Sequence, residues 1–389
     1  MALKLEPDAV VFFSHQDWWY HNPASSRRVA WCVSRERLTL FVNSIGMGMP
    51  PLRSRDFLAR VSRKIKSYCK HLKRVDGHLH VMTPIAIPSV KSCHFTAINC
   101  LLLRVQMMAT FQALHIRHPL VVVANPFFLP VIRSLPKAVL AYQVTDRYVA
   151  DESRDLMRLK ALHDDLTASA DHIFCSGKLN YDEFRTMRTR VHFLPHGVDY
   201  EHFASSPREP TVPDELRGLP RPIVGYVGVM ERKTLDDALL HAVMDANPDI
   251  VFVFIGILSK GLRGLTRHTN GIFLGRRDYA VLPQYVRAFD ACIMPFNQSQ
   301  WVRHCNPVKL NEYLAAGKPV VSTFFPELES YSGVVYCAED HLDFTCQLRT
   351  ALEENSPDAA RLRQERVRCR TWDLLARQML DTMTAGLAA

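Results

Sequence analysis

The strongest constraint on the fold is the stretch from His304 to Thr323, HCNPVKLNEYLAAGKPVVST. Pro307 near its start and Gly317 past its centre are typical of the first turn and the left-handed cap of a short helix. The β-branched residues after Pro319 predict a short buried strand. Loop, helix and strand in this order form the second half of a parallel α/β unit, where ligands lie at helix N-termini and strand carboxyl ends.

The same alternation of short apolar runs and helical patterns extends over the whole chain of 389 residues. It predicts doubly wound parallel sheets, in an α/β chain long enough for two domains. Residues 204–222 hold five prolines and little periodicity, which is typical of a linker. We therefore predict two Rossmann-like domains at 1–205 and 223–370, a linker at 206–222, and a final helix over roughly 358–387 whose end at 371–389 returns to the first domain.

The charge is distributed unevenly between these halves. Residues 1–205 hold 27 Lys and Arg against 17 Asp and Glu, a net of +10. Residues 206–389 hold 21 against 22, a net of −1, so the whole excess of +9 lies in the first half. Such asymmetry indicates that the first half faces an anionic partner.

Much of that excess lies in residues 53–74, which carry nine basic residues and one acid. The apolar residues of this segment fall on one helical stripe and predict an amphipathic helix. Its basic face is either a solvated surface or an element that binds an anionic membrane, to which each Lys or Arg contributes about 1 kcal/mol. Nucleic acid is the third alternative, but no reader motif with interleaved aromatic residues accompanies the charge, and we predict no nucleic acid partner.

Three features bear on the compartment. The first ten residues carry two acids and no sustained apolar run, so we expect no signal peptide. The ten cysteines include no CxxC pair and predict free thiols in a reducing compartment. The apolar segment 97–116 is interrupted by polar residues and predicts a buried helix, not a membrane span. We expect a cytoplasmic protein that is either free or peripheral on the inner face of the cell membrane.

The opening stretch supplies the first candidate binding residues. Lys309 and Glu312 lie three residues apart, so both can project from one side of the first helical turns. A cation at a helix start suits phosphate, and a carboxylate can accept two hydrogen bonds from ribose hydroxyls. The pair predicts a nucleotide-sugar site, to which we also assign Asn306 at the start of the same stretch.

A second candidate lies after the predicted strand 223–228. Gly228 permits close approach of the backbone to a pyrophosphate, and Arg232 and Lys233 follow in the loop before a helix. The alternative is that both basic residues are solvated loop charges. The sequence is not GxGxxG and has no acid twenty residues on, which disfavours a nicotinamide site.

Two candidates for acceptor chemistry lie in the first half. Asp146 directly follows a predicted buried strand, where a carboxylate acts as a general base or, alternatively, caps the next helix. Residues 15–28 mix aromatic and basic side chains, from which we select His15, Trp18 and Arg27. Such side chains suit a sugar or lipid-linked acceptor, or they plug a crevice. The histidines lack metal-ligand spacing such as HExxH, so we predict no metal and no cofactor.

With these residues in view, the chain resembles the GT-B glycosyltransferases, especially the group 1, family 4-like branch. LPHGVDYEHF resembles the family's end of the N-terminal domain, and GYVGVMERKTLDDALL resembles the first strand–loop–helix of the donor domain. NPVKLNEYLAAGKPVVST is similar to the donor-site block of bacterial exopolysaccharide and teichuronic-acid-type transferases. The resemblance implies two domains facing across a cleft, with Glu312 on the donor ribose and Lys309 on a phosphate oxygen.

The chain departs from the family's pattern in two places. Retaining enzymes of the family have two glutamates eight residues apart, whereas His304 stands eight residues before Glu312. The loop after Gly228 has Val229 where a Gly-Arg pair is common. Some inverting relatives use an aspartate base in the N-terminal domain, and Asp146 is similar, so both stereochemical outcomes stay open.

The expected function is metal-independent transfer of a sugar from a nucleotide-sugar to a hydroxyl of a polysaccharide or lipid-linked acceptor. One alternative is a nucleotide-sugar epimerase of the same architecture, which needs no acceptor. The other is a non-catalytic module that binds a membrane surface. Acceptor dependence and donor turnover distinguish the three.

Overall fold

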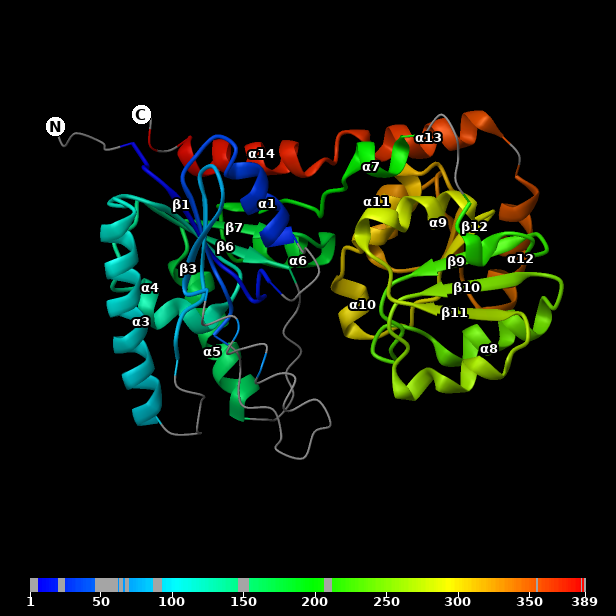
Figure 1. Cartoon of the computed structure of the whole chain (residues 1–389), viewed down its shortest axis with the longest axis horizontal. Coiled ribbons are helices and arrows are strands. Elements are labelled where there is room, and N and C mark those ends of the chain that lie inside the picture. The colour runs from blue at the N-terminus through cyan, green and yellow to red at the C-terminus, as the bar shows by residue number, and fades with distance from the viewer. Residues whose placement is uncertain are drawn as a thin grey trace. The chain divides into compact units, whose positions relative to one another are not determined.

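The computed structural model describes residues 6–19, 25–45, 70–86, 93–145, 154–205, 212–354 and 356–385, together with the single residues 62, 66 and 387. The chain divides into two compact units (Figure 1). The first comprises residues 1–176, 181–194 and 372–389, and the second comprises 177–180 and 195–371. Each is a doubly wound sheet with helices on its faces, so the predicted fold class is confirmed.

The first unit is built on a sheet of order β3-β4-β2-β1-β5-β6-β7-β8. All neighbouring pairs are parallel except β3 with β4. The strands are β1 (Val10–Phe13), β2 (Thr39–Val42), β3 (Leu72–Asp76), β4 (Leu79–Met82), β5 (Leu120–Val123), β6 (Val139–Val144), β7 (His172–Cys175) and β8 (Val191–Phe193).

The helices of the first unit cover both faces of this sheet, as parallel connections require. They are α1 (Ser25–Val33), α3 (Cys93–Ala113), η1 (Pro126–Phe128), α4 (Leu129–Ile132), α5 (Arg154–Ser169), α6 (Lys178–Arg185) and α14 (Trp372–Thr384).

The second unit has an all-parallel sheet of order β11-β10-β9-β12-β13-β14. The strands are β9 (Ile223–Val227), β10 (Val251–Ile255), β11 (Gly271–Gly275), β12 (Ala291–Met294), β13 (Val320–Thr323) and β14 (Tyr336–Ala338). The helices are α7 (Tyr200–Ala204), η2 (Asp214–Leu216), α8 (Asp237–Ala246), η3 (Lys260–Arg267), η4 (Tyr279–Val281), α9 (Leu282–Ala288), α10 (Gln300–His304), α11 (Val308–Ala315), η5 (Pro326–Tyr331), α12 (His341–Glu353) and α13 (Pro357–Arg368).

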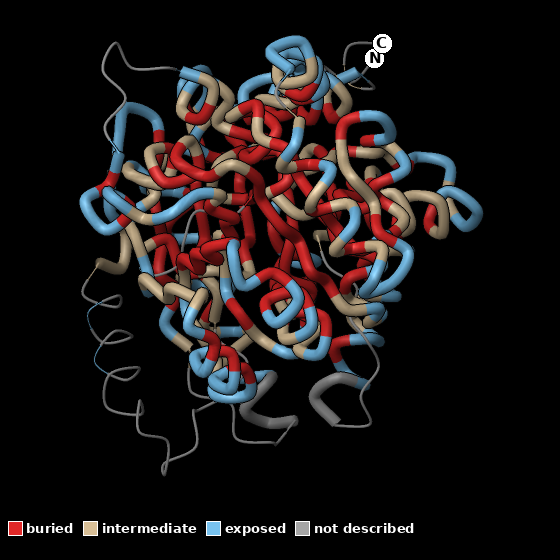
Figure 2. The backbone as a smooth tube through the Cα atoms, turned by 90° about the vertical axis from the view of Figure 1, so that its right-hand side faces the viewer, coloured by how far each residue is buried: buried red, intermediate tan, exposed pale blue. Residues whose placement is uncertain are grey.

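The cores form where the apolar runs predicted them. Every residue of β1, β2, β5, β6, β10, β12 and β13 is buried, and the buried backbone of Figure 2 follows these strands. A parallel sheet with helices on both faces buries both sides of each central strand, which is why the strands read as continuous apolar runs.

The predicted helix over 53–74 is wrong at its end. Leu72–Asp76 forms strand β3, which pairs antiparallel with β4. The turn between them is closed by hydrogen bonds from Gly77 N to Asp76 Oδ1 (2.8 Å) and from Arg74 Nε to Gly77 O (2.8 Å). An Asp-Gly turn of this kind is a strong hairpin signal. Ser62 and Lys66 are helical, and the rest of residues 53–69 lies outside the described residues.

The division between the units also differs in position from the predicted one. It falls between Leu194 and Pro195, because the segment from His196 onward is hydrogen-bonded within the second unit. Residues 212–222 of the predicted linker include the short helix η2, with Leu216 buried. Residues 206–211 lie outside the described part of the chain.

The predicted final helix over 358–387 is interrupted. Helix α13 ends at Arg368, and α14 begins at Trp372. Between them, Arg370 O accepts a hydrogen bond from Val198 N (2.8 Å), and Thr371 bridges Val198 in parallel. Beyond the break, α14 packs on α1, with Arg35 Nη1 2.7 Å from Asp373 Oδ1. The last helix therefore belongs to the first unit, as expected.

No helix in the described part of the chain is long and apolar enough to cross a membrane.

Candidate functional site

The candidate donor site of the second unit lies where the strand order of its sheet reverses. Strands β10 and β11 extend the sheet on one side of β9, and β12, β13 and β14 extend it on the other. Parallel sheets bind ligands outside the carboxyl ends of the strands at such a switch point. Gly228 follows β9, and Pro295 and Phe296 follow β12. The carboxyl end of β9 is therefore the candidate donor site.

Gly228 adopts a backbone conformation that other residues rarely take, with φ of +151°. A Cβ at this position would lie 3.1 Å from both Lys309 Cε and Tyr226 Oη. Gly256, at the end of β10, has φ of +138°, and a Cβ there would lie 2.7 Å from the carbonyl carbon of Gly228. Both glycines are needed because the two strand ends and the lysine approach each other closely.

The side chain of Lys309 lies over this glycine. Its Nζ donates a hydrogen bond to Tyr226 Oη (2.7 Å), and the tyrosine hydroxyl donates to Val229 O (3.1 Å). Nζ also lies 4.1 Å from the centroid of the Tyr226 ring and 5.5 Å from that of Phe296. Aromatic faces stabilise an ammonium group where carboxylates are few.

Burial lowers the pKa of Lys309 to about 8, although the charge of Glu312 acts in the opposite direction. A partly buried lysine whose pKa is lowered toward neutral pH is typical of functional sites. The geometry leaves this cation beside a bare backbone at a strand end, which is what a phosphate group requires.

Glu312 lies on the same helix, α11, and its side chain is buried at 8% exposure. It is three residues beyond Lys309 on the same helix, so both can project from one side of α11. The sequence prediction that Lys309 and Glu312 share one side of α11 therefore agrees with the structure.

Asn306, the third predicted donor residue of this block, makes protein contacts with both ends of its amide. Its Nδ2 donates to Glu327 Oε1 (2.7 Å), and its Oδ1 accepts from His196 N (3.3 Å). Glu327 Oε2 in turn accepts from Lys178 N (2.8 Å). Burial raises the pKa of Glu327. Asn306 thus acts as a positioning residue for the loop at His196.

Helix α11 holds the same loop from a second side. Asn311 Nδ2 donates to His196 O (3.0 Å), and Asn311 Oδ1 accepts from Tyr331 Oη (2.6 Å). Arg370 donates to the same tyrosine oxygen (2.5 Å) and lies 4.6 Å over its ring. Sequence reasoning missed Asn311, Glu327 and Tyr331. The available signal was a polar residue at a helix position that lies in the core. A buried polar side chain needs hydrogen-bond partners, so its position predicts polar neighbours.

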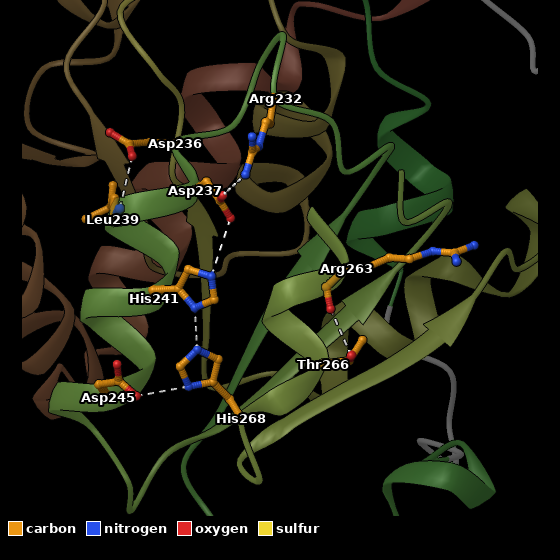
Figure 3. A network of polar contacts seen from close by, with 9 residues as sticks. All are labelled: Arg232, Asp236, Asp237, Leu239, His241, Asp245, Arg263, Thr266 and His268. Atoms are coloured by element: carbon orange, nitrogen blue, oxygen red, sulfur yellow. Dashed lines mark hydrogen bonds and ion pairs between the residues drawn. The ribbon is translucent and has the colours of Figure 1, made fainter. Parts of the chain in front are cut away.

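Arg232 and Lys233 extend from the loop between β9 and α8. Arg232 Nη2 lies 2.7 Å from Asp237 Oδ2, and its side chain is 66% exposed. Asp237 Oδ1 lies 3.6 Å from His241 Nε2, His241 Nδ1 lies 2.6 Å from His268 Nε2, and His268 Nδ1 lies 3.1 Å from Asp245 Oδ1. Figure 3 shows this chain of contacts along α8.

Both basic residues, which the sequence analysis assigned to the donor phosphates, contact other side chains of the second unit. Arg232 is anchored by an acid at the start of α8, while Lys233 Nζ lies 5.2 Å from the centroid of the Trp301 ring. Asp236, the residue before α8, caps the helix by accepting from Leu239 N (3.0 Å). The structure places neither basic side chain in contact with Lys309, so their role toward the donor stays a prediction.

His304, the departure from the family's pattern, is buried at 2% exposure at the end of α10. Its Nδ1 lies 2.8 Å from Gln300 O, one turn back on the helix. Its carbonyl closely approaches Gly177, where a Cβ would lie 3.2 Å from the carbonyl carbon. The same carbonyl accepts a hydrogen bond from Asn180 Nδ2 (3.4 Å).

The predicted acceptor residues of the first unit pack on one another. Trp18, at 4% exposure, lies with its ring 4.9 Å from Phe41 edge-on and 6.4 Å from Trp31. The Arg27 guanidinium lies 4.5 Å over the same ring and donates to Trp18 O (2.8 Å). His15 lies two residues after the end of β1. Of the two roles considered, this packing favours the crevice plug for Trp18.

The predicted base, Asp146, lies outside the described residues, two positions after β6. Helix α1 meets this strand through Ser26 Oγ, which donates to Gln143 Oε1 (2.9 Å). Among the described residues, no group of three or more His, Cys, Asp or Glu side chains is arranged to hold a metal ion.

Comparison with known proteins agrees with this architecture. The structure is similar to sucrose-phosphate synthase from Thermosynechococcus elongatus, with a TM-score of 0.73 at 13% identity, covering 98% of this chain and 99% of that one. It is also similar to Anabaena HepE in complex with UDP, with a TM-score of 0.67 at 14% identity, covering 97% and 100%. At such identities the likeness shows the fold, which is that of GT-B glycosyltransferases.

The sequence of the second unit matches a known family. Residues 221–354 match the family model of glycosyl transferases group 1, and all six predicted donor residues lie within this range. The chain is 30% identical over 224 residues to a Bacillus subtilis protein described as "Putative teichuronic acid biosynthesis glycosyltransferase TuaH". The match covers 54% of this chain and 56% of that relative, a little over half its length. The second unit thus contains a group 1 glycosyl transferase domain.

Proposed function

We propose that the protein transfers a sugar from a nucleotide-sugar to a hydroxyl group of a polysaccharide or lipid-linked acceptor. The observation that carries this proposal is the arrangement at the end of β9, where Lys309 Nζ lies over Gly228 within the group 1 glycosyl transferase domain. A similar structure has been solved with UDP, and another, the trehalose-6-phosphate structure from E. coli, with UDP-2-fluoro glucose. UDP-sugars are therefore the first donors to test.

The chemistry of transfer requires that the charge developing on the departing diphosphate be stabilised. Lys309 supplies a fixed cation, and Gly228 has no side chain of its own that would keep phosphate from the backbone. When an anionic donor binds beside it, the lysine stays protonated, because an opposite charge favours the charged form. Glu312, buried on the same helix, is the proposed ligand of the ribose hydroxyls.

Arg232 and Lys233 are proposed to complete the neutralisation of the diphosphate, and Asn306 to position the site through the His196 loop. Transfer is proposed to proceed without a metal or cofactor, because these cations meet the charge that a metal would otherwise meet. Asp146 is the proposed general base toward the acceptor hydroxyl, and His15 and Arg27 are the proposed acceptor contacts, with Trp18 packed beneath Arg27.

The proposed location is the cytoplasmic side of the cell membrane, with residues 53–74 meeting anionic lipid through their nine basic residues. Neutralising these charges is expected to weaken binding to anionic vesicles. Unchanged binding would overturn this part of the proposal without touching the donor site.

The experiment that tests transfer has two parts. A thermal-shift screen of UDP-, GDP- and other nucleotide-sugars is expected to reveal one donor that raises Tm, since a ligand that binds only the folded state stabilises it by RT ln(1 + [L]/Kd). Nucleotide release is then measured with and without acceptor.

Release that depends on the acceptor supports transfer. Conversion of the sugar without any acceptor would instead establish the epimerase. Binding of vesicles with no turnover of any donor would establish the non-catalytic module. The match to a glycosyl transferase family favours the first outcome.

A further inference from the structure

Helix α3 (Cys93–Ala113) exposes apolar side chains that the sequence led us to expect inside the core. Its inner face is buried as predicted, through Leu103, Met107 and Phe111 at 1–3% exposure. The prediction of a wholly buried helix over 97–116 is nevertheless wrong. In Figure 1, α3 lies at the edge of its unit, with α4 and the strands on one side only.

The exposed side chains form a stripe. Ile98, Leu101, Val105 and Met108 are 50%, 64%, 59% and 44% exposed. Their spacing of three, four and three residues places them in one line along the helix. This outer stripe is opposite the inner face of Leu103, Met107 and Phe111, because two positions apart on a helix differ by about 200°.

An apolar helix on both faces is normally buried all round. Scattered exposed apolar residues need no explanation, but a continuous row of four large ones marks an interaction surface. The row continues past the helix end into a hollow of about 490 Å³ lined by Met108, Phe111, Gln112, His115, Arg117 and Pro136.

The helix itself carries no acidic residue, whereas two carboxylates, Asp8 and Asp76, lie near its surroundings. The sequence contains no Asp or Glu from residue 77 to residue 145, a stretch that includes all of α3. Arg104 is exposed on α3, and Arg117 follows its end. On the neighbouring hairpin, Lys73 and Arg74 are exposed on the edge strand β3.

Contacts link that hairpin to the helix. Thr110 Oγ1 donates to Met82 Sδ (3.6 Å) on β4, and Gln106 exchanges hydrogen bonds with both Ile85 N and Ile85 O (2.8 Å each). The carboxylate at the far end of the helix, Asp8, accepts from the backbone of Arg117 and His118.

We propose that the outer stripe of α3 docks on the surface of an anionic lipid bilayer, with the helix lying in the plane of the interface. An apolar row on a helix that carries Arg104 and no carboxylate of its own is complementary to acyl chains below a layer of negative headgroups. A second copy of this chain fits less well, because a two-fold contact would place Arg104 and its basic neighbours against themselves. The residues of this stripe belong neither to the segment 53–74 nor to the donor block.

The test uses the full chain and sedimentation with vesicles of phosphatidylcholine, with or without about 30% phosphatidylglycerol. The double variant Leu101→Gln/Val105→Gln is expected to partition onto anionic vesicles at least about ten-fold less than wild type. The two substitutions remove the free energy gained when these apolar side chains leave water for the bilayer. The matched control is Leu342→Gln on α12, which removes an apolar side chain that is 81% exposed in the second unit. That control is expected to bind like wild type.

A charge variant keeps the proposal testable if the double variant folds poorly. Gln112 is exposed one turn beyond Met108 on the same stripe. Gln112→Glu is expected to weaken binding to anionic vesicles, and Gln112→Lys to strengthen it, while circular dichroism stays that of wild type.

Three results would overturn the proposal. The first is equal binding by wild type and the double variant, and the second is equal binding to vesicles with and without phosphatidylglycerol. The third is a wild-type dimer that the double variant abolishes, with no vesicle binding by either, which would assign the stripe to a second copy. The thermal shift with the nucleotide-sugar is expected to be the same for all these variants, so failure here and failure of the proposed transfer are distinguishable.

Discussion

Both units are doubly wound sheets, but the chain that follows the central strand differs between them. In the first unit, β1 lies between β2 and β5 at the point where the strand order reverses, and the chain after it folds back as Trp18, buried at 4% exposure. In the second unit, β9 lies between β10 and β12, and the chain after it is Gly228, with Lys309 and the Tyr226 hydroxyl beside it.

The comparison shows that an equivalent position in the fold is not by itself a binding site. Both strand ends lie where α/β sheets place ligands. In the first unit the Trp18 ring packs on Phe41 and lies under Arg27, whereas in the second unit Gly228 leaves a bare backbone beside an ammonium group. Small anionic ligands suit the second end because backbone and cation are both accessible to phosphate.

The largest expected effect tests the filled strand end. Trp18→Ala is expected to lower the free energy of unfolding by about 3–5 kcal/mol, because a large buried ring is removed. Urea denaturation measures it. Trp31→Ala is the matched control, since its ring stacks on Trp18 but is 37% exposed, and a smaller loss is expected. A stable Trp18→Ala protein with a raised KM for acceptor would instead assign the ring to acceptor binding.

The next effect tests the open strand end. Lys309→Ala is expected to lower kcat/KM by about 10²–10³, the usual result of removing one group that stabilises developing negative charge. Initial rates with the donor found by thermal shift measure it. Lys160→Ala, which removes a surface lysine paired with Asp164 in the first unit, is expected to leave the rate unchanged. Full activity in Lys309→Ala would show that the donor binds elsewhere.

Gly228→Ala tests whether the bare backbone is required. The new Cβ is expected to displace Lys309 and to cost about 1–3 kcal/mol of stability through the positive φ. Gly218→Ala is the matched control, because its φ is +74° but no atom lies within 4 Å of the added Cβ. Both variants should lose stability by strain, and Gly228→Ala alone should lose donor binding. Equal donor binding in the two would contradict the assignment.

Donor affinity is expected to depend on pH through the same lysine. The pKa of Lys309 is lowered to about 8, so its charge in the free protein is lost as the pH rises above that value. Donor Kd, measured by calorimetry, should therefore increase by up to about ten-fold per pH unit above pH 8. In Lys309→Ala this dependence should disappear, and its persistence would assign the titration to another group.

The smallest effect contrasts the two units in acid. Burial lowers the pKa of His80, His163, His172 and His192 in the first unit and of His241 in the second. Each then binds fewer protons folded than unfolded, so its contribution is lost as the pH falls below the unfolded value of about 6.5. In the second unit the raised pKa of Glu327 acts in the opposite direction, because the folded state keeps its proton longer.

The first unit is therefore expected to lose more stability than the second between about pH 7.5 and about pH 5.5. Hydrogen exchange measured by mass spectrometry resolves the two units in the whole chain. His163→Gln should reduce the loss in the first unit, since that imidazole, 2.6 Å from Tyr142 Oη, is one of the groups involved. Equal losses in both units would contradict the contrast.

Much of the fold could be predicted from the sequence because its signals are local. Central strands such as Val251–Ile255 are buried on both faces and therefore read as unbroken apolar runs. The helix of the donor block is framed by Pro307 and Gly317, whose φ of +72° is the left-handed cap expected of it. The spacing of Lys309 and Glu312 on one helix was enough to place them together.

Other features could not be predicted because their cause lies in distant residues. Residues Leu72–Asp76 have a helical apolar pattern in their own segment but complete the edge of a sheet beside β4. The break after α13 exists because Val198, far away in sequence, bonds to the chain there. The partners of the Asn306 amide, Glu327 and His196, could not be predicted because they lie 21 and 110 residues away in the sequence.

The sequence by itself determined the two doubly wound sheets and the helix that presents Lys309, since periodicity and helix caps act over a few residues. Only the tertiary structure decided which strand end stays open. Trp18 is buried because Arg27 and Phe41 close over it, and Gly228 stays bare because Lys309, 81 residues away, occupies the space above it. The same holds for α3, whose outer stripe is exposed because none of the described helices and strands of its own unit covers it. Occupancy of such spaces depends on contacts between distant segments, which no local pattern records.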